Sequence, residues 1–200
     1  MAGAQLIVLS EHVDYWNHLG WRDPYSSRQY SQRQSQYASR FGLEGPYTPE
    51  IVVDGASEFV GSDRARGESA ISGALVAKKI SMSVSGVSLD ANGFLRAHLD
   101  TATLPSSLAQ ADVVFVVAIN HARSRVAGGE NQGRTLDHVA VVSRMLQVGT
   151  ISPGQRFGRE VGLQVDSGVK LSDLRLIAFI QEPNQGKILG ATLMLPDSTK

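Results

Sequence analysis

The chain has no cysteine among its 200 residues. A thiolate is the nucleophile of disulfide exchange, so thiol redox chemistry, disulfides and Cys-ligated metals are all excluded. Charge of one sign is also lacking, because Lys plus Arg and Asp plus Glu both number 19; no net field draws in nucleic acid or an anionic membrane. No apolar run approaches the roughly 20 residues that span a bilayer. Residues 1–5 do not have the pattern of a signal peptide, so we expect neither a membrane span nor a signal peptide in this chain.

Hydrophobic residues make up 42% of the sequence, which is enough for a buried core. Over residues 1–79 the periodicity alternates between strand and helix. The β-branched run at 5–9 predicts a buried strand, and a helix should follow to Phe41, ended by Gly42. Two strands at 51–53 and 57–60 should pair through a tight turn at Asp54 and Gly55. A second helix, capped at Ser62 or Asp63, should close this part, giving the order β, α, β, β, α.

From Ile80 onward the pattern changes to the alternation of half-buried strands. Turn signals separate the runs, and no helical period is present. Strands are predicted at 80–84, 94–99, 112–120, 136–145, 162–166, 174–181 and 188–195. This pattern favours an antiparallel β-sandwich over residues 80–200, with a domain boundary between residues 79 and 80.

The densest group of reactive side chains follows the first predicted strand and consists of Glu11, His12, Asp14, Tyr15, Trp16, His18 and Trp21. Such a group could bind a divalent metal or supply a His–carboxylate pair for acid–base chemistry. Alternatively, it braces the loop while the tryptophans pack on the sheet. His12 and Asp14 are two positions apart and would point to opposite sides of a continuing strand. We therefore favour the structural interpretation and expect no metal and no cofactor.

Two further stretches, at Pro49 and at residues 128–134, are candidates for a functional role. The bond before Pro49 is of the only kind at which a cis peptide is cheap, although most such bonds are trans. The Gly-rich stretch 128–134 lies between two strand patterns and lacks the Lys and the helix of a phosphate loop, so a long hairpin turn is favoured over nucleotide binding. No Gly-x-Ser-x-Gly elbow is present. We assign no catalytic residue.

Several of these stretches together resemble a known family. They are His12-Val13-Asp14-Tyr15-Trp16, Leu19-Gly20-Trp21-Arg22-Asp23-Pro24, Tyr47-Thr48-Pro49-Glu50-Ile51-Val52-Val53-Asp54-Gly55, Phe59-Val60-Gly61-Ser62-Asp63, residues 129–134, Gln181-Glu182-Pro183 and Ile188-Leu189-Gly190-Ala191. The family is an uncharacterised bacterial one of secreted thioredoxin-like proteins, domain-of-unknown-function family twelve-twenty-three. The resemblance extends over nearly the whole chain.

The resemblance implies an α/β, thioredoxin-like N-terminal part that is incomplete, since its first strand and helix are lacking, followed by the antiparallel β-sandwich-like part. It implies a cis bond at Thr48–Pro49 and a periplasmic or secreted location. Family members carry a signal peptide and a Cys-x-x-Cys-type motif upstream of where this sequence starts. The implied site surface consists of Glu11, His12, Asp14, Trp16, Tyr47, Thr48 and Pro49, and a second candidate loop contains Glu130, Asn131, Arg134 and His138.

Three functional hypotheses follow. In the first, the chain is a thioredoxin-like relative without redox cysteines that serves as a binding surface, for instance for a protein. In the second, a longer form with an upstream cysteine pair is a thiol–disulfide oxidoreductase. In the third, the β-sandwich binds a protein or glycan through the loop at residues 130–134. Because a lacking strand would leave unpaired edges and an exposed apolar face, we also expect the chain to form a homodimer or to re-pair its first strand.

Overall fold

The fold was analysed in a computed structural model, which describes residues 5–129 and 131–196. The helices are α1 (Arg28–Phe41) and α2 (Arg64–Leu75), and short 3-10 turns lie at η1 (Asn17–Leu19) and η2 (Leu171–Asp173). The strands are β1 (Glu50–Val53), β2 (Ser57–Val60), β3 (Met82–Leu89), β4 (Phe94–Thr101), β5 (Ala111–Arg125), β6 (Thr135–Ile151), β7 (Gly158–Gln164), β8 (Leu174–Gln181) and β9 (Ile188–Met194).

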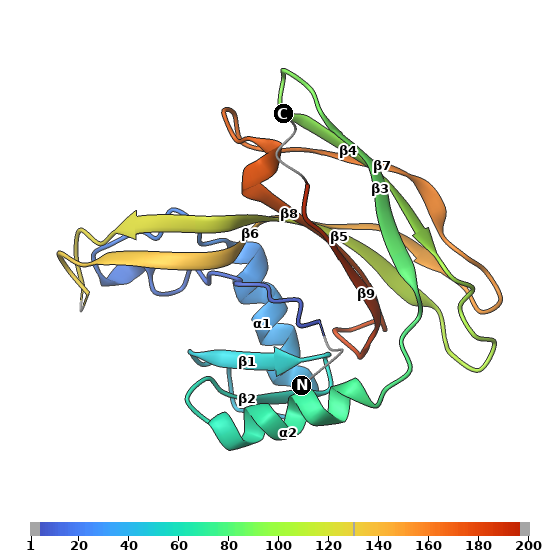
Figure 1. The fold of residues 1–200 in the computed structure, drawn as a ribbon. Helices are drawn as coiled ribbons and strands as arrows, with labels where there is room; N and C mark the ends of the chain where they lie inside the picture. The colour runs from blue at the N-terminus through green and yellow to red at the C-terminus, as the bar shows by residue number, and fades with distance from the viewer. Residues whose placement is uncertain (1–4, 130, 197–200) are drawn as a thin grey trace.

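The larger part of the molecule is a β-sandwich (Figure 1). One sheet has the strand order β6-β5-β8-β9 and the other has the order β3-β4-β7, and all neighbours in both are antiparallel. Phe115 and Leu99 lie fully buried between the sheets. Because side chains alternate across a strand, Val116 of β5 faces the opposite side and is also fully buried. The central strand β5 is therefore covered on both faces.

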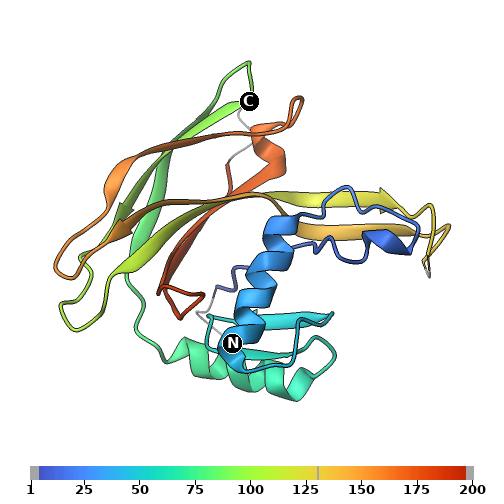
Figure 2. The same cartoon turned by 180° about the vertical axis from the view of Figure 1, so that it is seen from behind.

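Helix α1 covers the outer face of the four-stranded sheet, as Figure 2 shows from behind. Its Tyr30 is 3% exposed, packs in one cluster with Val116 and Phe179, and donates a hydrogen bond to the Val142 carbonyl at 3.0 Å. Ser27 caps the start of α1, because its hydroxyl accepts a hydrogen bond from the Gln29 amide. These contacts join the first third of the chain to the sandwich.

Strands β5 and β6, of 15 and 17 residues, form a hairpin whose outer end projects as an arm beside the chain that precedes α1 (Figures 1 and 2). Residues 10–25, which we call the N-terminal loop, lie along this arm. The amide of Ser10 donates to the carbonyl of Ala140, and the amide of Val142 donates to Ser10 in return. The loop is thus attached to the arm through backbone pairing.

The expectation of a thioredoxin-like α/β N-terminal part is wrong. The structure consists mostly of antiparallel β-sheets, and β1 and β2 pair only with each other. Residues 5–9, expected to form a buried strand, belong to no sheet. An apolar, β-branched run becomes a strand only when a neighbouring strand takes up its backbone groups, and among the described residues no strand is hydrogen-bonded to residues 5–9. Helix α1, the β1–β2 hairpin and α2 do form where the sequence predicts them.

Two further expectations concern the bond before Pro49 and the domain boundary. The bond between Thr48 and Pro49 is cis. The domain boundary predicted between residues 79 and 80 falls in the connection from α2 to β3. The division into two domains stays a prediction. Within residues 5–129 and 131–196, neither helix is long and apolar enough to cross a membrane.

Candidate functional site

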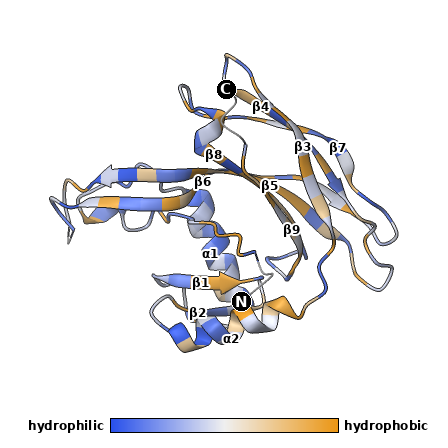
Figure 3. Ribbon diagram, in the orientation of Figure 1, coloured by the Kyte–Doolittle hydropathy of each residue, from blue (hydrophilic) through white to orange (hydrophobic). Residues whose placement is uncertain are grey.

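A groove of about 1440 Å³ separates the β1–β2 hairpin from the first residues of the chain. Residues 5–9 line one side of it, and β1 lines the other. The ends of α2 and β9 and the buried face of α1 complete it, through Leu75, Ala191 and Tyr30 among others. Figure 3 shows apolar colouring on both β1 and the chain at residues 5–9. The groove is therefore a largely apolar depression between β1 and residues 5–9.

The edge of β1 that faces away from β2 carries free backbone groups. Pro49 accepts a hydrogen bond from Gly61 on β2's side, and bonding alternates along an antiparallel pair, so Glu50 and Val52 direct their N–H and C=O groups outward. The next outward carbonyl, that of Asp54, accepts from the Ile188 amide at 2.8 Å. Among the described residues we find no backbone partner for the outward groups of Glu50 and Val52.

Residues 5–9 present a second unpaired edge. Ile7 and Leu9 pack inward against the cluster around Tyr30, whereas Leu6 and Val8 are 58% and 51% exposed. Within the part of the chain that the structure describes, these residues have no backbone hydrogen bond before Ser10. Both sides of the groove therefore offer unpaired backbone, and apolar side chains point to both faces.

Four of the predicted site residues meet at one end of β1. The indole of Trp16 donates to the Thr48 hydroxyl at 3.0 Å, beside the cis bond to Pro49. The hydroxyl of Tyr47 donates to Glu58 at 2.6 Å, and burial, followed by this hydrogen bond and the charge of Glu58, raises the pKa of Tyr47. Trp16, Thr48 and Pro49 line the groove.

Glu50, the first residue of β1, stands at the same end of the groove. Its Oε2 accepts a hydrogen bond from Gln34 at 2.8 Å, while its Oε1 is buried without a hydrogen-bond partner. Burial raises the pKa of Glu50, and the nearby Glu58 charge raises it further. The sequence offered no signal for this residue, which reads as the ordinary first position of a strand.

Glu11 and Asp14 have partners inside the fold. Arg33 of α1 contacts Glu11 at 3.3 Å, and burial raises the pKa of Glu11 although the guanidinium opposes the effect. Asp14 accepts a hydrogen bond from the Ser31 hydroxyl at 2.5 Å. Both carboxylates thus hold the N-terminal loop against α1.

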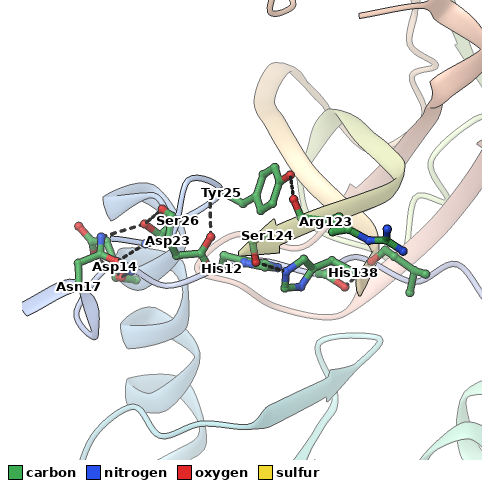
Figure 4. A network of polar contacts seen from close by, with 12 residues as sticks. His12, Asp14, Asn17, Asp23, Tyr25, Ser26, Arg123, Ser124 and His138 are labelled. Carbon is green, nitrogen blue, oxygen red and sulfur yellow. Dashed lines mark hydrogen bonds and ion pairs between the residues drawn. The ribbon is translucent and has the colours of Figure 1, made fainter. Parts of the chain in front are cut away.

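His12 belongs to a second cluster, shown in Figure 4, in which the N-terminal loop meets the arm. Its Nδ1 lies 2.6 Å from Asp23, and its ring centroid lies 4.9 Å from that of His138 on β6. His138 Nε2 in turn is 2.8 Å from the hydroxyl of Ser124 on β5. Tyr25 packs against both imidazoles, with centroid distances of 5.8 and 5.7 Å. We call these five residues the histidine cluster.

The electrostatics of the histidine cluster are asymmetric. Burial alone would raise the pKa of Asp23, but hydrogen bonds from His12 and from the Tyr25 amide bring it below its usual value, so Asp23 is a carboxylate at neutral pH. Burial, and next the charge of His12, lower the pKa of His138. His138 is thus held neutral beside an imidazole that has its own carboxylate partner.

The structure joins His138 of the second candidate loop to His12 of the first, although the two are 126 positions apart. Asn131 lines the groove, and Arg134 closes the hairpin turn through a backbone bond from its amide to Asn131. Glu130 lies outside the described residues. In those that are described, no group of three or more His, Asp or Glu side chains could hold a metal ion.

Comparisons with known proteins extend over most of the chain. The structure of protein AGR_C_4864 from Agrobacterium tumefaciens superposes with a TM-score of 0.70 at 23% identity, covering 96% of this chain and 81% of that one. HBP35 of Porphyromonas gingivalis gives a TM-score of 0.61 at 14% identity, covering 86% of this chain and 61% of that one. Both likenesses show the fold alone. The search of curated proteins finds no match.

The sequence profile of the family described as "Protein of unknown function (DUF1223)" matches residues 1–181. This match covers most of the chain. The chain has no cysteine for redox chemistry. The protein therefore belongs to the DUF1223 family.

Proposed function

We propose that the protein is a binding module that takes an extended segment of another polypeptide into the groove between β1 and residues 5–9. The bound segment, which we call the guest strand, pairs with the outward edge of β1 and lies beside the free backbone of residues 5–9. The observation that carries this proposal is the pair of unpaired edges facing each other across one apolar groove. Addition of a strand to an exposed sheet edge is a common mode of peptide recognition.

Backbone pairing supplies the first part of the affinity. Glu50 and Val52 each offer an outward N–H and C=O. A net hydrogen bond contributes about 0.5–1.5 kcal/mol, so the β1 edge alone supplies only a few kcal/mol. Side-chain burial must therefore supply the remainder.

The side chains beside the two edges favour a guest strand that is apolar on both faces. Ile7 and Leu9 face the α1 side of the groove, while Leu6 and Val8 are exposed on the other side. Leu75 of α2 remains 45% exposed and lines the groove as well. A strand that is buried on both faces reads as a continuous apolar run rather than an alternating one.

The direct test is a titration with the acetylated and amidated peptide Lys-Thr-Val-Ile-Val-Thr-Lys, followed by calorimetry. We expect saturable binding with one peptide per chain. A matched peptide with N-methyl groups on alternate central residues keeps the side chains but loses the donors on one edge. Equal affinity of the two peptides, or no binding of either, would refute pairing with β1.

Two proline variants locate the binding edge. Val52→Pro removes an outward N–H of β1 and should weaken peptide binding severalfold, as expected for the loss of one hydrogen bond. Proline at an edge leaves the rest of the sheet intact. Val60→Pro places the same residue at the exposed end of β2, away from the groove, and should bind the peptide normally. If both variants lose binding equally, the effect is one of folding, and circular dichroism would show it.

A second copy of the chain is the other polypeptide to consider. If the groove is filled by self-association, equilibrium sedimentation will give a concentration-dependent dimer that the peptide dissociates. A monomer that binds the peptide would exclude this occupant.

We also propose a periplasmic or extracellular location, supported by the resemblance to secreted family members. Fractionation of cells that express the full-length gene tests this proposal. Recovery of the protein only with the cytoplasm would contradict it.

A further inference from the structure

We infer that the contact between His12 and His138 is an acid-sensitive attachment of the N-terminal loop, and that acidification weakens guest binding in the groove. This inference rests on the proposed function for its second half. The first half, release of the loop from the arm, depends only on the geometry of the histidine cluster.

The contact joins two segments that bear on the groove. His12 and Asp23 of the N-terminal loop line the groove, as do Val126 and Leu136 of the arm. The loop meets the arm through the His12 and His138 rings, 4.9 Å apart, and through the hydrogen bond from the Tyr25 hydroxyl to the Arg123 carbonyl at 3.1 Å. Movement of the loop would therefore change one wall of the groove.

Charge within the cluster decides the response to acid. Asp23 is the carboxylate beside His12, at 2.6 Å. The other nearby carboxylate, Asp137, is already paired with Arg123 at 2.6 Å, where both side chains are largely exposed. If both imidazoles carry a proton, Asp23 alone faces two positive rings. Like charges at this separation repel, and the surrounding side chains shield them from water only in part.

Protonation leaves the other contacts of the cluster in place. The Ser124 hydroxyl can accept a hydrogen bond from a protonated His138 as readily as it donates one to the neutral ring. Tyr25 has no charge to offer, although its ring touches both imidazoles. The contact that acid disfavours is therefore the one between the two rings, which is also the one between loop and arm.

The lowered pKa of His138 determines whether acid strengthens or weakens attachment of the loop. The folded protein, with the loop attached, binds this proton more weakly than a detached loop or an unfolded chain would. Attachment is thus strongest above the ordinary pKa of histidine and is lost as the pH falls through that value toward the lower folded pKa. Histidine is the side chain whose charge changes in this range.

Tryptophan fluorescence tests attachment of the loop without any ligand. The chain has two tryptophans, and both Trp16 and Trp21 lie in the N-terminal loop. Between about pH 7.5 and about pH 5 we expect a reversible change of emission in the wild type. His138→Gln keeps a partner for Ser124 but cannot be charged, so its emission should not change. His18→Gln alters a histidine of the same loop that lies outside the cluster, and should behave as wild type.

Hydrogen exchange gives a second measure of the same step. The amides of Ser10 and Val142 pair the loop with β6. In the wild type their protection, relative to the sandwich amides, should fall about tenfold on acidification, because a detached loop leaves both amides open to solvent. In His138→Gln the ratio should stay constant. An unchanged ratio in the wild type, or an equal fall in the variant, overturns the inference.

Affinity for the peptide Lys-Thr-Val-Ile-Val-Thr-Lys then tests the link to the groove. The dissociation constant of the wild type should rise about tenfold between the two pH values and that of His138→Gln should not. If the peptide fails to bind at pH 7.5, the proposed function and the acid-induced release of a guest strand are both refuted. Fluorescence and hydrogen exchange still test whether acid detaches the N-terminal loop from the arm. If the peptide binds equally at both pH values, the groove function stands and the inference is overturned.

Discussion

Replacement of Arg33 by methionine should destabilise the protein in a pH-dependent way. The guanidinium contacts Glu11 at 3.3 Å, donates to Gln181 at 3.1 Å and to the Tyr37 hydroxyl at 3.0 Å, and stacks over Phe179. Methionine preserves much of the packing but leaves Glu11 without its cation. The variant thus combines an unpaired, largely buried carboxylate with the loss of the hydrogen bonds to Gln181 and Tyr37.

The magnitude follows from burial. Breaking a fully buried ion pair costs about 3–5 kcal/mol. The side chains of Arg33 and Glu11 are 12% and 24% exposed, so water screens the remaining charge in part. We therefore expect a loss of about 2–3 kcal/mol near pH 7.5, which in a chain of this size lowers the melting temperature by about 5–10 °C.

The pH dependence has a definite sign. The folded pKa of Glu11 is raised, chiefly by burial, and loss of Arg33 raises it further. Such a group stabilises the fold fully below its unfolded pKa and loses this contribution as the pH rises through the folded pKa. The deficit of Arg33→Met should thus shrink as the pH falls from about 7.5 to about 5.

Urea unfolding of wild type, Arg33→Met and the double variant Arg33→Met with Glu11→Gln measures both effects. The double variant should recover more than half of the loss, because a neutral amide replaces the unpaired carboxylate. A single-variant deficit below about 0.5 kcal/mol, or one that is equal at both pH values, would refute the reasoning.

The remaining predictions concern the scaffold. Gly190→Ala should lower stability by about 1–3 kcal/mol in urea unfolding, because the new Cβ would lie 2.2 Å from the Ile80 carbonyl oxygen. Gly73→Ala, in an exposed turn of α2 with no atom near the new Cβ, should raise stability by about 0.5–1 kcal/mol, and a loss would contradict this. Tyr30→Phe should cost about 1–2 kcal/mol in the same assay, since the Val142 carbonyl loses its buried donor; an unchanged midpoint would show that water replaces the hydroxyl.

Local signals in the sequence predict local structure well. Gly42 ends α1 at a φ of 70°, and Asp54 and Gly55 adopt φ values of 53° and 62°, as a tight hairpin turn requires. Cap and turn residues act within a few positions, so they can be interpreted without the rest of the chain. The same holds for the alternation that indicates the strands of the sandwich.

Residues 5–9 show where this reasoning fails. Their composition suits a buried strand, but strand formation depends on a partner that residues elsewhere in the chain must provide. The family resemblance implies a thioredoxin-like α/β fold for this part of the chain, and the antiparallel sheets of the structure show that this expectation is wrong. Helix α1 covers the sheet of the sandwich instead, through Tyr30 and Phe179.

The candidate site was only partly accessible to sequence reasoning. The sequence predicts both His12 and His138 as site residues, but in separate groups, because only the fold of the arm brings them together. Asp23 and Ser124 have no local signal that distinguishes them from a loop acid and a strand hydroxyl. Glu50 would be recognised only from the buried oxygen that lacks a partner.

The β5–β6 hairpin belongs to the four-stranded sheet and also pairs with the N-terminal loop, and this second contact affects the order of folding. Ser10 leaves the ribosome before its pairing partner Ala140, which is synthesised 130 residues later. Contacts so distant in sequence form slowly, since a large loop must close first. The segment at residues 7–10 therefore cannot pack, and Ile7 and Leu9 stay unburied, until the β5–β6 hairpin has formed. A nascent chain arrested before β6 should consequently bind chaperones through the segment that contains Ile7 and Leu9.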